Sequence, residues 1–113
     1  MTETKSRLEY SVNELVHFLE GEISIKDYFG EIESETKTAA LIDNALDINY
    51  KIRADMKLLD FELTVSLGGP NIWCDSQFVY GRWGNDRIEI TYADNIGLYE
   101  AIEEIYQAAV NIC

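Results

Sequence analysis

The feature that most constrains this fold is the run of residues 58–92, in which strand patterns and turn signals follow one another. Residues 59–67 alternate apolar and polar side chains, the period-2 pattern of a strand with one buried and one solvent-exposed face. The apolar positions are Leu59, Phe61, Leu63, Val65 and Leu67. The pattern stops at Gly68-Gly69-Pro70-Asn71, where two glycines and a proline indicate a turn.

Three further strands are predicted after this turn. They are Asn71–Asp75, Phe78–Trp83 and Arg87–Tyr92. Ser76-Gln77 and Gly84-Asn85-Asp86 separate them, and connections this short join antiparallel strands. The sequence therefore predicts a four-stranded antiparallel meander.

Helices are expected before and after this sheet. Ser11 and Glu14 have the spacing of a capping box, so a helix is predicted from Ser11 to a stop at Gly21. A second, short helix is predicted from Ser24 and is interrupted at Gly30. The last helix, residues 95–109, is amphipathic and is capped by Asp94 or Asn95. Its predicted buried residues are Leu98, Ile102, Ile105 and Ala109.

Residues 36–56 allow two interpretations. Apolar residues at steps of three and four predict one helix that begins at Thr36 and continues to Met56. Ile48, Tyr50 and Ile52 also alternate with polar residues, which indicates a strand over residues 48–53. The unbroken periodicity favours the helix. The fold class predicted for residues 1–113 is thus a single α+β domain with N-terminal helices, a four-stranded sheet and a C-terminal helix.

Charge is the most unusual property of the chain. It has 21 acidic and 9 basic residues, for a formal net charge of -12. Residues 58–113 contain nine acids and only two bases, Arg82 and Arg87. Acidity alone keeps a small protein soluble, but a surface of this kind also repels nucleic acids and anionic membranes and attracts basic partners. The expected partner is therefore a basic protein, with no direct binding of nucleic acid or membrane.

The chain lacks the usual signs of an enzyme. His17 is the only histidine, so a catalytic triad or a multi-histidine metal site would depend on it alone. Phosphate-loop, dinucleotide-binding, C-x-x-C and H-E-x-x-H motifs are missing. No catalytic residue, metal ligand or cofactor is predicted.

Cysteine usage and hydropathy bear on location. Cys74 and Cys113 do not form a disulfide framework, which favours a reducing compartment. Cys74 is expected to be a small packed residue. The polar start of the chain does not resemble a signal peptide, and no apolar run approaches the roughly 18 residues that span a bilayer. We expect the protein to be cytoplasmic.

Two groups of acids and two anchor residues are the candidate partner-binding residues. The glutamates of the last helix share one face: Glu100, Glu103 and Glu104. The second group is predicted on the polar face of the sheet: Asp60, Glu62 and Glu89. Arg82 and Trp83 are candidate anchors, since Arg, Trp and Tyr are enriched at interface hot spots.

The segments LGGPNIW and FVYGRWGNDRIEI, followed by a glutamate-rich amphipathic helix, resemble the C-terminal part of small acidic proteins of bacteriophages and mobile elements. In size, charge and lack of catalytic residues the chain is similar to phage anti-CRISPR and antirestriction DNA mimics. The resemblance implies a non-enzymatic inhibitor, in the cytoplasm of a bacterial host, whose carboxylates stand in for phosphates. The implied target is a nucleic-acid-binding defence protein, with a CRISPR-Cas effector favoured.

Three alternatives remain open. The protein could be an antitoxin or immunity protein that neutralises a basic toxin. It could be a small metal-dependent enzyme built on carboxylates such as Asp60 and Glu62. It could also self-assemble through aromatic residues of the sheet. The oligomeric state does not follow from the sequence.

Overall fold

The protein is built on one five-stranded antiparallel sheet. The computed structural model describes residues 2–112, and the side chains of residues 6–111. Its strands lie in the sheet in chain order: β1 (Asp47–Ile52), β2 (Leu58–Ser66), β3 (Asn71–Cys74), β4 (Phe78–Trp83) and β5 (Asp86–Thr91). The predicted α+β class and the meander β2–β5 are confirmed, whereas the predicted number of strands is wrong because β1 is an additional strand.

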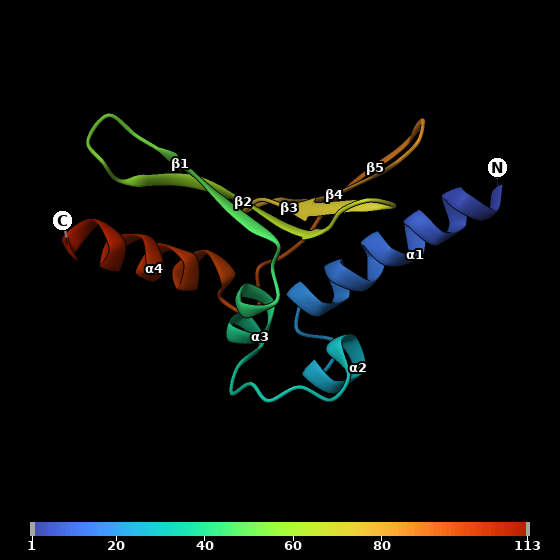
Figure 1. Cartoon of the computed structure of the whole chain (residues 1–113), viewed down its shortest axis with the longest axis horizontal. Coiled ribbons are helices and arrows are strands. Elements are labelled where there is room, and N and C mark those ends of the chain that lie inside the picture. The colour runs from blue at the N-terminus through green and yellow to red at the C-terminus, as the bar shows by residue number, and fades with distance from the viewer. Residues whose placement is uncertain (1, 113) are drawn as a thin grey trace.

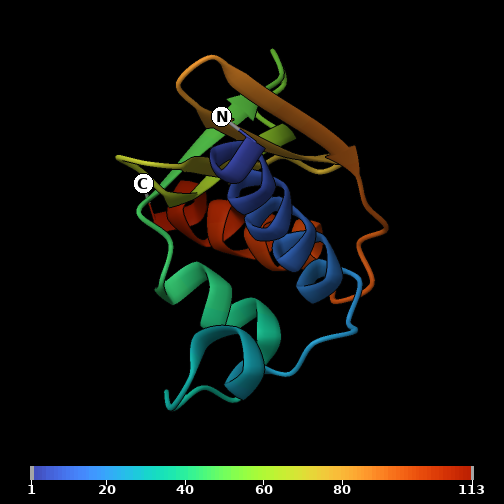
Figure 2. The same cartoon turned by 90° about the vertical axis from the view of Figure 1, so that its right-hand side faces the viewer.

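Four helices lie on the same side of this sheet (Figure 1). They are α1 (Thr2–Leu19), α2 (Ile25–Phe29), α3 (Lys37–Asp43) and α4 (Leu98–Ile112). α1 and α4 lie next to the sheet, and α2 and α3 lie further from it (Figures 1 and 2). Among residues 2–112, no helix covers the opposite face, which we call the open face. None of the described helices has the length and apolar character needed to cross a membrane.

The segment predicted as one helix from Thr36 to Met56 divides into α3 and β1. Its predicted start is right, because Thr36 Oγ1 accepts a hydrogen bond from the Ala39 amide at 3.1 Å. The helix ends at Asp43, and the Asn44 side chain donates to the Ala40 carbonyl at 2.8 Å. The long helix is therefore wrong.

β1 confirms the alternative interpretation of residues 48–53. Ile48 pairs with Leu63 and Tyr50 pairs with Phe61 across the β1–β2 ladder. Such cross-strand apolar pairs stabilise a sheet. The β1–β2 hairpin forms in place of the longer helix because β1 forms hydrogen bonds with the backbone groups along one edge of β2. The same register also buries apolar side chains of both strands.

α1 begins at Thr2, nine residues before the predicted start at Ser11. Ser11 and Glu14 therefore lie inside the helix and do not form the predicted capping box. The buried face of α1 includes Leu8, Val12, Leu15 and Leu19. These residues are spaced by four, three and four, so a stripe of helical period faces the sheet. Residues 2–7 contain no apolar residue, so the sequence shows no amphipathic pattern for the first turns of α1.

Two other helix starts agree with the sequence. Ser24 Oγ accepts a hydrogen bond from the Asp27 amide at 3.1 Å and caps α2. The Asp94 carboxylate accepts from the amides of Leu98 and Tyr99 at 2.8 and 2.9 Å. The predicted acidic cap of the last helix is thus confirmed, although the helix begins at Leu98 instead of residue 95.

The alternation predicted for residues 59–67 is correct only in its centre. Phe61 and Leu63 are fully buried, but Leu59 and Leu67 are 60% and 63% exposed. The register of the β1–β2 pair shifts next to Ile52, which brings Leu58 opposite Ile52 and leaves Leu59 as the extra residue. Leu58 is buried in its place, as expected beside a β-bulge.

Candidate functional site

α4 carries three of the predicted partner-binding residues and is fixed to the β1–β2 hairpin. Two tyrosine hydroxyls of α4 form hydrogen bonds with this hairpin. Tyr99 donates to the Leu58 carbonyl at 3.1 Å, and Tyr106 donates to the Met56 carbonyl at 2.7 Å. Its buried residues are Leu98, Ile102 and Tyr106. The helix therefore has one defined face toward the sheet.

The buried face of α4 differs from the predicted one. Ile105 is 41% exposed and Ala109 is exposed, so their predicted burial is wrong. Tyr106 occupies the inner position because its ring packs near Tyr50 of β1, with ring centroids 5.4 Å apart. The Tyr106 ring buries a large apolar surface while its hydroxyl bonds a carbonyl, so Tyr106 takes the buried position and the neighbouring Ile105 is left partly exposed.

The outer side of α4 is an acidic strip of three residues, Glu100, Glu103 and Glu104, which we call the acidic helix face. Glu100 and Glu104 are exposed and Glu103 is half-buried. Residues separated by three and four positions are neighbours on a helix. α4 contains no lysine or arginine, so the strip carries negative charge without a compensating base on the same helix.

The second predicted group lies on the open face of the sheet. Asp60, Glu62 and Glu89 alternate along β2 and β5 with residues that point toward the helices. Glu89 is paired with Tyr80 of β4. The acids on the open face therefore point away from the side of the sheet that α4 covers, and one flat partner surface does not reach both groups.

The open face is mixed in charge, and part of its acidity supports the fold. Asp60 Oδ1 accepts hydrogen bonds from the amides of Phe61 and Ser76 at 2.7 and 3.1 Å, and Lys51 is its cross-strand neighbour. Arg82 pairs with Arg87 across β4 and β5. The open face therefore carries both acids and bases, whereas the acidic helix face carries acids alone.

Aromatic residues cross the open face between these charges. Trp73 and Tyr80 are cross-strand neighbours and stack, with ring centroids 5.4 Å apart and an interplanar angle of 14°. The Tyr80 hydroxyl donates to Asp75 Oδ2 at 2.7 Å. Tyr92, in contrast, is buried and donates to the Asp75 carbonyl. Trp73 and Tyr80 are thus available at the surface, whereas Tyr92 is a core residue.

The two predicted anchors do not form one patch. Arg82 and Trp83 are consecutive in β4, and consecutive strand residues point to opposite faces. Arg82 lies on the open face, and Trp83 lies on the helix side, where its indole nitrogen is near Gly69. Both residues lie in the strand predicted from Phe78 to Trp83, so its alternation already separates them; only the choice of which face the helices cover required the structure.

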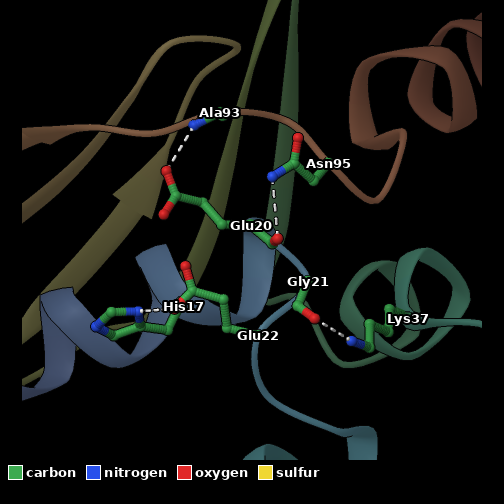
Figure 3. A network of polar contacts seen from close by, with 7 residues as sticks. All are labelled: His17, Glu20, Gly21, Glu22, Lys37, Ala93 and Asn95. Atoms are coloured by element: carbon green, nitrogen blue, oxygen red, sulfur yellow. Dashed lines mark hydrogen bonds and ion pairs between the residues drawn. The ribbon is translucent and has the colours of Figure 1, made fainter.

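A network of polar contacts joins α1 to distant parts of the chain (Figure 3). The Glu20 carboxylate accepts a hydrogen bond from the Ala93 amide at 2.9 Å, and the Glu20 carbonyl accepts from the Asn95 side chain at 3.1 Å. Lys37 of α3 donates to the Gly21 carbonyl at 3.1 Å. These contacts fix the end of α1 to α3 and to the connection between β5 and α4.

His17, Glu20 and Glu22 in this network also have the composition of a metal site. One ligand atom from each lies within 4.8 Å of the others. Ligands of zinc lie about 2.0–2.2 Å from the ion, so the three side chains would have to move closer together. His17 Nδ1 is 2.7 Å from Glu22 Oε2, and Glu20 is bonded to Ala93. The observed contacts describe a structural junction.

Cys74 is the packed residue that its position in a strand predicts. Its side chain is fully buried. Burial raises the pKa of the thiol, and nearby carboxylates, first that of Asp75, raise it further. A thiol held in its neutral form is a poor nucleophile, so Cys74 has a packing role. Cys113 lies outside the described residues.

A cavity of about 330 Å³ was not expected from the sequence. It lies between α1, α2, α3 and the turn that joins β2 to β3. Tyr10, Glu14, Tyr28 and Phe29 are among its lining residues. These residues come from two helices, and the cavity is completed by α3 and by β2, β3 and their connection, which lie further along the chain. No local motif signals such a convergence.

Comparison with protein-family models, with curated proteins and with solved structures finds no match to this chain.

Proposed function

We propose that the protein is a non-enzymatic inhibitor that binds a nucleic-acid-binding defence protein of bacteria, with a CRISPR-Cas effector as the favoured target. The observation that supports this proposal best is the acidic helix face. Glu100, Glu103 and Glu104 are presented by a helix that has no basic residue and is anchored by its opposite side. Carboxylates on such a surface occupy a basic channel in place of phosphates.

The acidic helix face is the primary contact in this proposal. Its carboxylates form no hydrogen bond or ion pair with another described side chain, whereas one oxygen of Asp60 on the open face accepts hydrogen bonds from two backbone amides. The open face also carries Arg82 and Arg87, which a basic channel would repel. We therefore assign Asp60, Glu62 and Glu89 a secondary role in long-range attraction.

The first test is capture of the partner. Tagged protein is incubated with nuclease-treated bacterial lysate, and the bound proteins are identified by mass spectrometry. The proposal expects a basic protein that binds DNA or RNA, and it expects added duplex DNA to displace this protein from the bait. Retention in the presence of saturating DNA would exclude a shared site.

Charge reversal tests the acidic helix face directly. Glu100→Lys, Glu103→Lys and Glu104→Lys together are expected to weaken binding to the captured protein by more than about tenfold, or about 1.4 kcal/mol. The matched control is Glu31→Lys, Glu33→Lys and Glu35→Lys, because these exposed residues of the α2–α3 connection change the net charge equally. Binding is measured by surface plasmon resonance, with folding checked by circular dichroism.

Two outcomes would count against the proposal. Equal losses from the α4 and loop variants would show a response to net charge alone. A captured partner that kills the host when expressed alone would identify an immunity protein instead. The rate of association should also fall steeply with ionic strength, because charge steering is screened by salt.

A further inference from the structure

The cavity beneath α1 has aromatic walls and one charged group. Its volume of about 330 Å³ lies at the lower end of the range of about 300–1,000 Å³ found for ligand pockets, so it suits a group the size of an amino-acid side chain. Tyr28 and Phe29 of α2 meet edge to face, with ring centroids 4.9 Å apart. Tyr28 also stacks on the buried Phe18 at 4.8 Å. The aromatic wall is therefore held by the core.

Glu14 is the only charged residue in the lining of this cavity. Its side chain is half-buried, and it forms no ion pair with any residue that the structure describes. Hydrogen bonding to the Glu14 carboxylate, and then its negative charge, raise the pKa of the Tyr10 hydroxyl. Burial and then the charge of Glu14 raise the pKa of Tyr28. Both phenols are thus close enough to sense this carboxylate.

The lining contains acceptors that complement a cation. Asn44 lines the cavity, and its side-chain amide nitrogen donates to the Ala40 carbonyl, while its amide oxygen can accept a hydrogen bond from a ligand. Partly desolvated carboxylates attract cations more strongly than exposed ones. Aromatic faces add a favourable interaction with ammonium and guanidinium groups. An anion would meet repulsion from Glu14, and a purely apolar group would leave that carboxylate without a counter-ion.

We propose that this cavity binds an organic cation, an alkylguanidinium or alkylammonium group, with Glu14 as the counter-ion and Tyr10, Tyr28 and Phe29 as its walls. The site uses residues separate from the acidic helix face, so it goes beyond the proposed inhibitor function. The cation belongs to a free small molecule or to an arginine or lysine side chain of a protein.

The test compares a cation with its neutral isostere. Butylguanidinium and butylurea are titrated into ¹⁵N-labelled protein, and amide chemical shifts are followed by NMR. Butylguanidinium is expected to shift the amides of Tyr28, Phe29 and Leu41 in a saturable way, and to bind at least about tenfold more tightly than butylurea. A peptide arm, acetyl-Gly-Arg-Gly-amide against its citrulline analogue, distinguishes the sources: tighter binding of the arginine peptide than of butylguanidinium would identify a protein side chain, and weaker binding would identify a free small molecule.

Variants locate the binding group. Glu14→Gln keeps the shape of the side chain and removes its charge, and it is expected to weaken butylguanidinium binding by about tenfold. Glu9→Gln is the matched control, because Glu9 lies on α1 and is exposed. Phe29→Leu, which keeps an apolar wall but removes the ring, should weaken binding by a smaller factor. Equal affinity for butylurea, or unchanged affinity in a folded Glu14→Gln variant, would overturn the proposal.

Discussion

Gly81 lies where α1 comes closest to the sheet. A Cβ atom at this position would lie 2.4 Å from Val12 Cγ2 and 2.9 Å from Leu8 Cδ1. Leu8 and Val12 are both fully buried, so neither has free space to move into. The glycine is required here by packing and not by backbone conformation.

We expect Gly81→Ala to destabilise the protein by about 1–3 kcal/mol, the usual cost of overpacking a close-packed core. Urea unfolding followed by circular dichroism measures the loss. In a Val12→Ala background the same substitution should cost clearly less, because the nearest clashing methyl group is gone. Equal costs in the two backgrounds would mean that α1 does not pack against Gly81.

Individual residues show what local patterns can predict. Helix starts at Ser24 and Thr36 are predictable because an N-cap depends only on a side chain and an amide three residues away. Leu59 was assigned to the wrong side because a β-bulge depends on the partner strand. Strand alternation alone predicts that Arg82 and Trp83 point to opposite faces, but it does not say which of the two faces the helices cover.

At the scale of elements, α4 is attached to the β1–β2 hairpin by hydrogen bonds as well as by apolar contact. The Tyr106 hydroxyl donates to the Met56 carbonyl at 2.7 Å, and the ring is 4% exposed. Met56 lies in the turn between the two strands and has a positive φ of 67°. The bond therefore couples the orientation of α4 to the conformation of a turn.

Tyr106→Phe is expected to lower the free energy of unfolding by about 0.5–1.5 kcal/mol, because it removes one buried hydrogen bond and keeps the ring. Tyr50→Phe serves as the control, since the Tyr50 hydroxyl bonds none of the described residues and its ring, which is half-buried, packs near that of Tyr106. Chemical denaturation compares the two. A larger loss in Tyr50→Phe would contradict this account of how α4 is held.

The elements differ in how far the sequence predicted them. β2–β5 were found because short turns join neighbouring strands, so pattern and topology agree. The helical spacing of residues 36–56 predicts one helix in place of α3 and β1, and only pairing with β2 decides between helix and strand. The start of α1 was placed too late because Leu8 alone gives too little amphipathic signal among polar neighbours.

At the scale of the whole molecule, several buried groups resist ionisation. Burial raises the pKa of Cys74, Tyr28 and Tyr92 above their usual values. In the unfolded chain these groups titrate near their ordinary values, about 8.5 for a thiol and about 10 for a phenol. As the pH rises, the unfolded state therefore releases protons before the folded state does, and stability falls.

We expect the free energy of unfolding to decline from about pH 8 upward and to decline first through the thiol. Urea titrations at several pH values between neutrality and pH 10 measure this slope. Cys74→Ala should start from a lower stability but lose less of it as the pH rises to about 9.5. An identical slope in both proteins would show that the Cys74 thiol does not contribute.

The candidate partner-binding acids were predicted as residues, but their arrangement was not. Charge and spacing identify Glu100, Glu103 and Glu104 as one helix face. The sequence does not show that Asp60 and Glu62 point away from the side of the sheet that α4 covers, because that depends on which sheet face packs against α4. The cavity around Glu14 was equally hidden, since tertiary packing alone brings its walls together.

The order β1-β2-β3-β4-β5 also governs how the chain reaches this structure. Each strand pairs with its neighbour in sequence, so the sheet requires only short loop closures, which are fast. α1 packs on β4 and β5, and Glu20, which directly follows α1, accepts a hydrogen bond from the amide of Ala93, 73 positions away. Forming that contact closes most of the chain into one loop, so we expect docking of α1 to be the last and slowest folding step.

Stopped-flow refolding tests this order of events. Ile90→Val in β5 should slow refolding nearly in proportion to the stability it removes, whereas Leu8→Ala in α1 should act mainly by speeding unfolding. The reverse pattern would place α1 in the folding nucleus. The expected pattern would mean that the sheet forms first and that α1 docks onto it only after all five strands are paired.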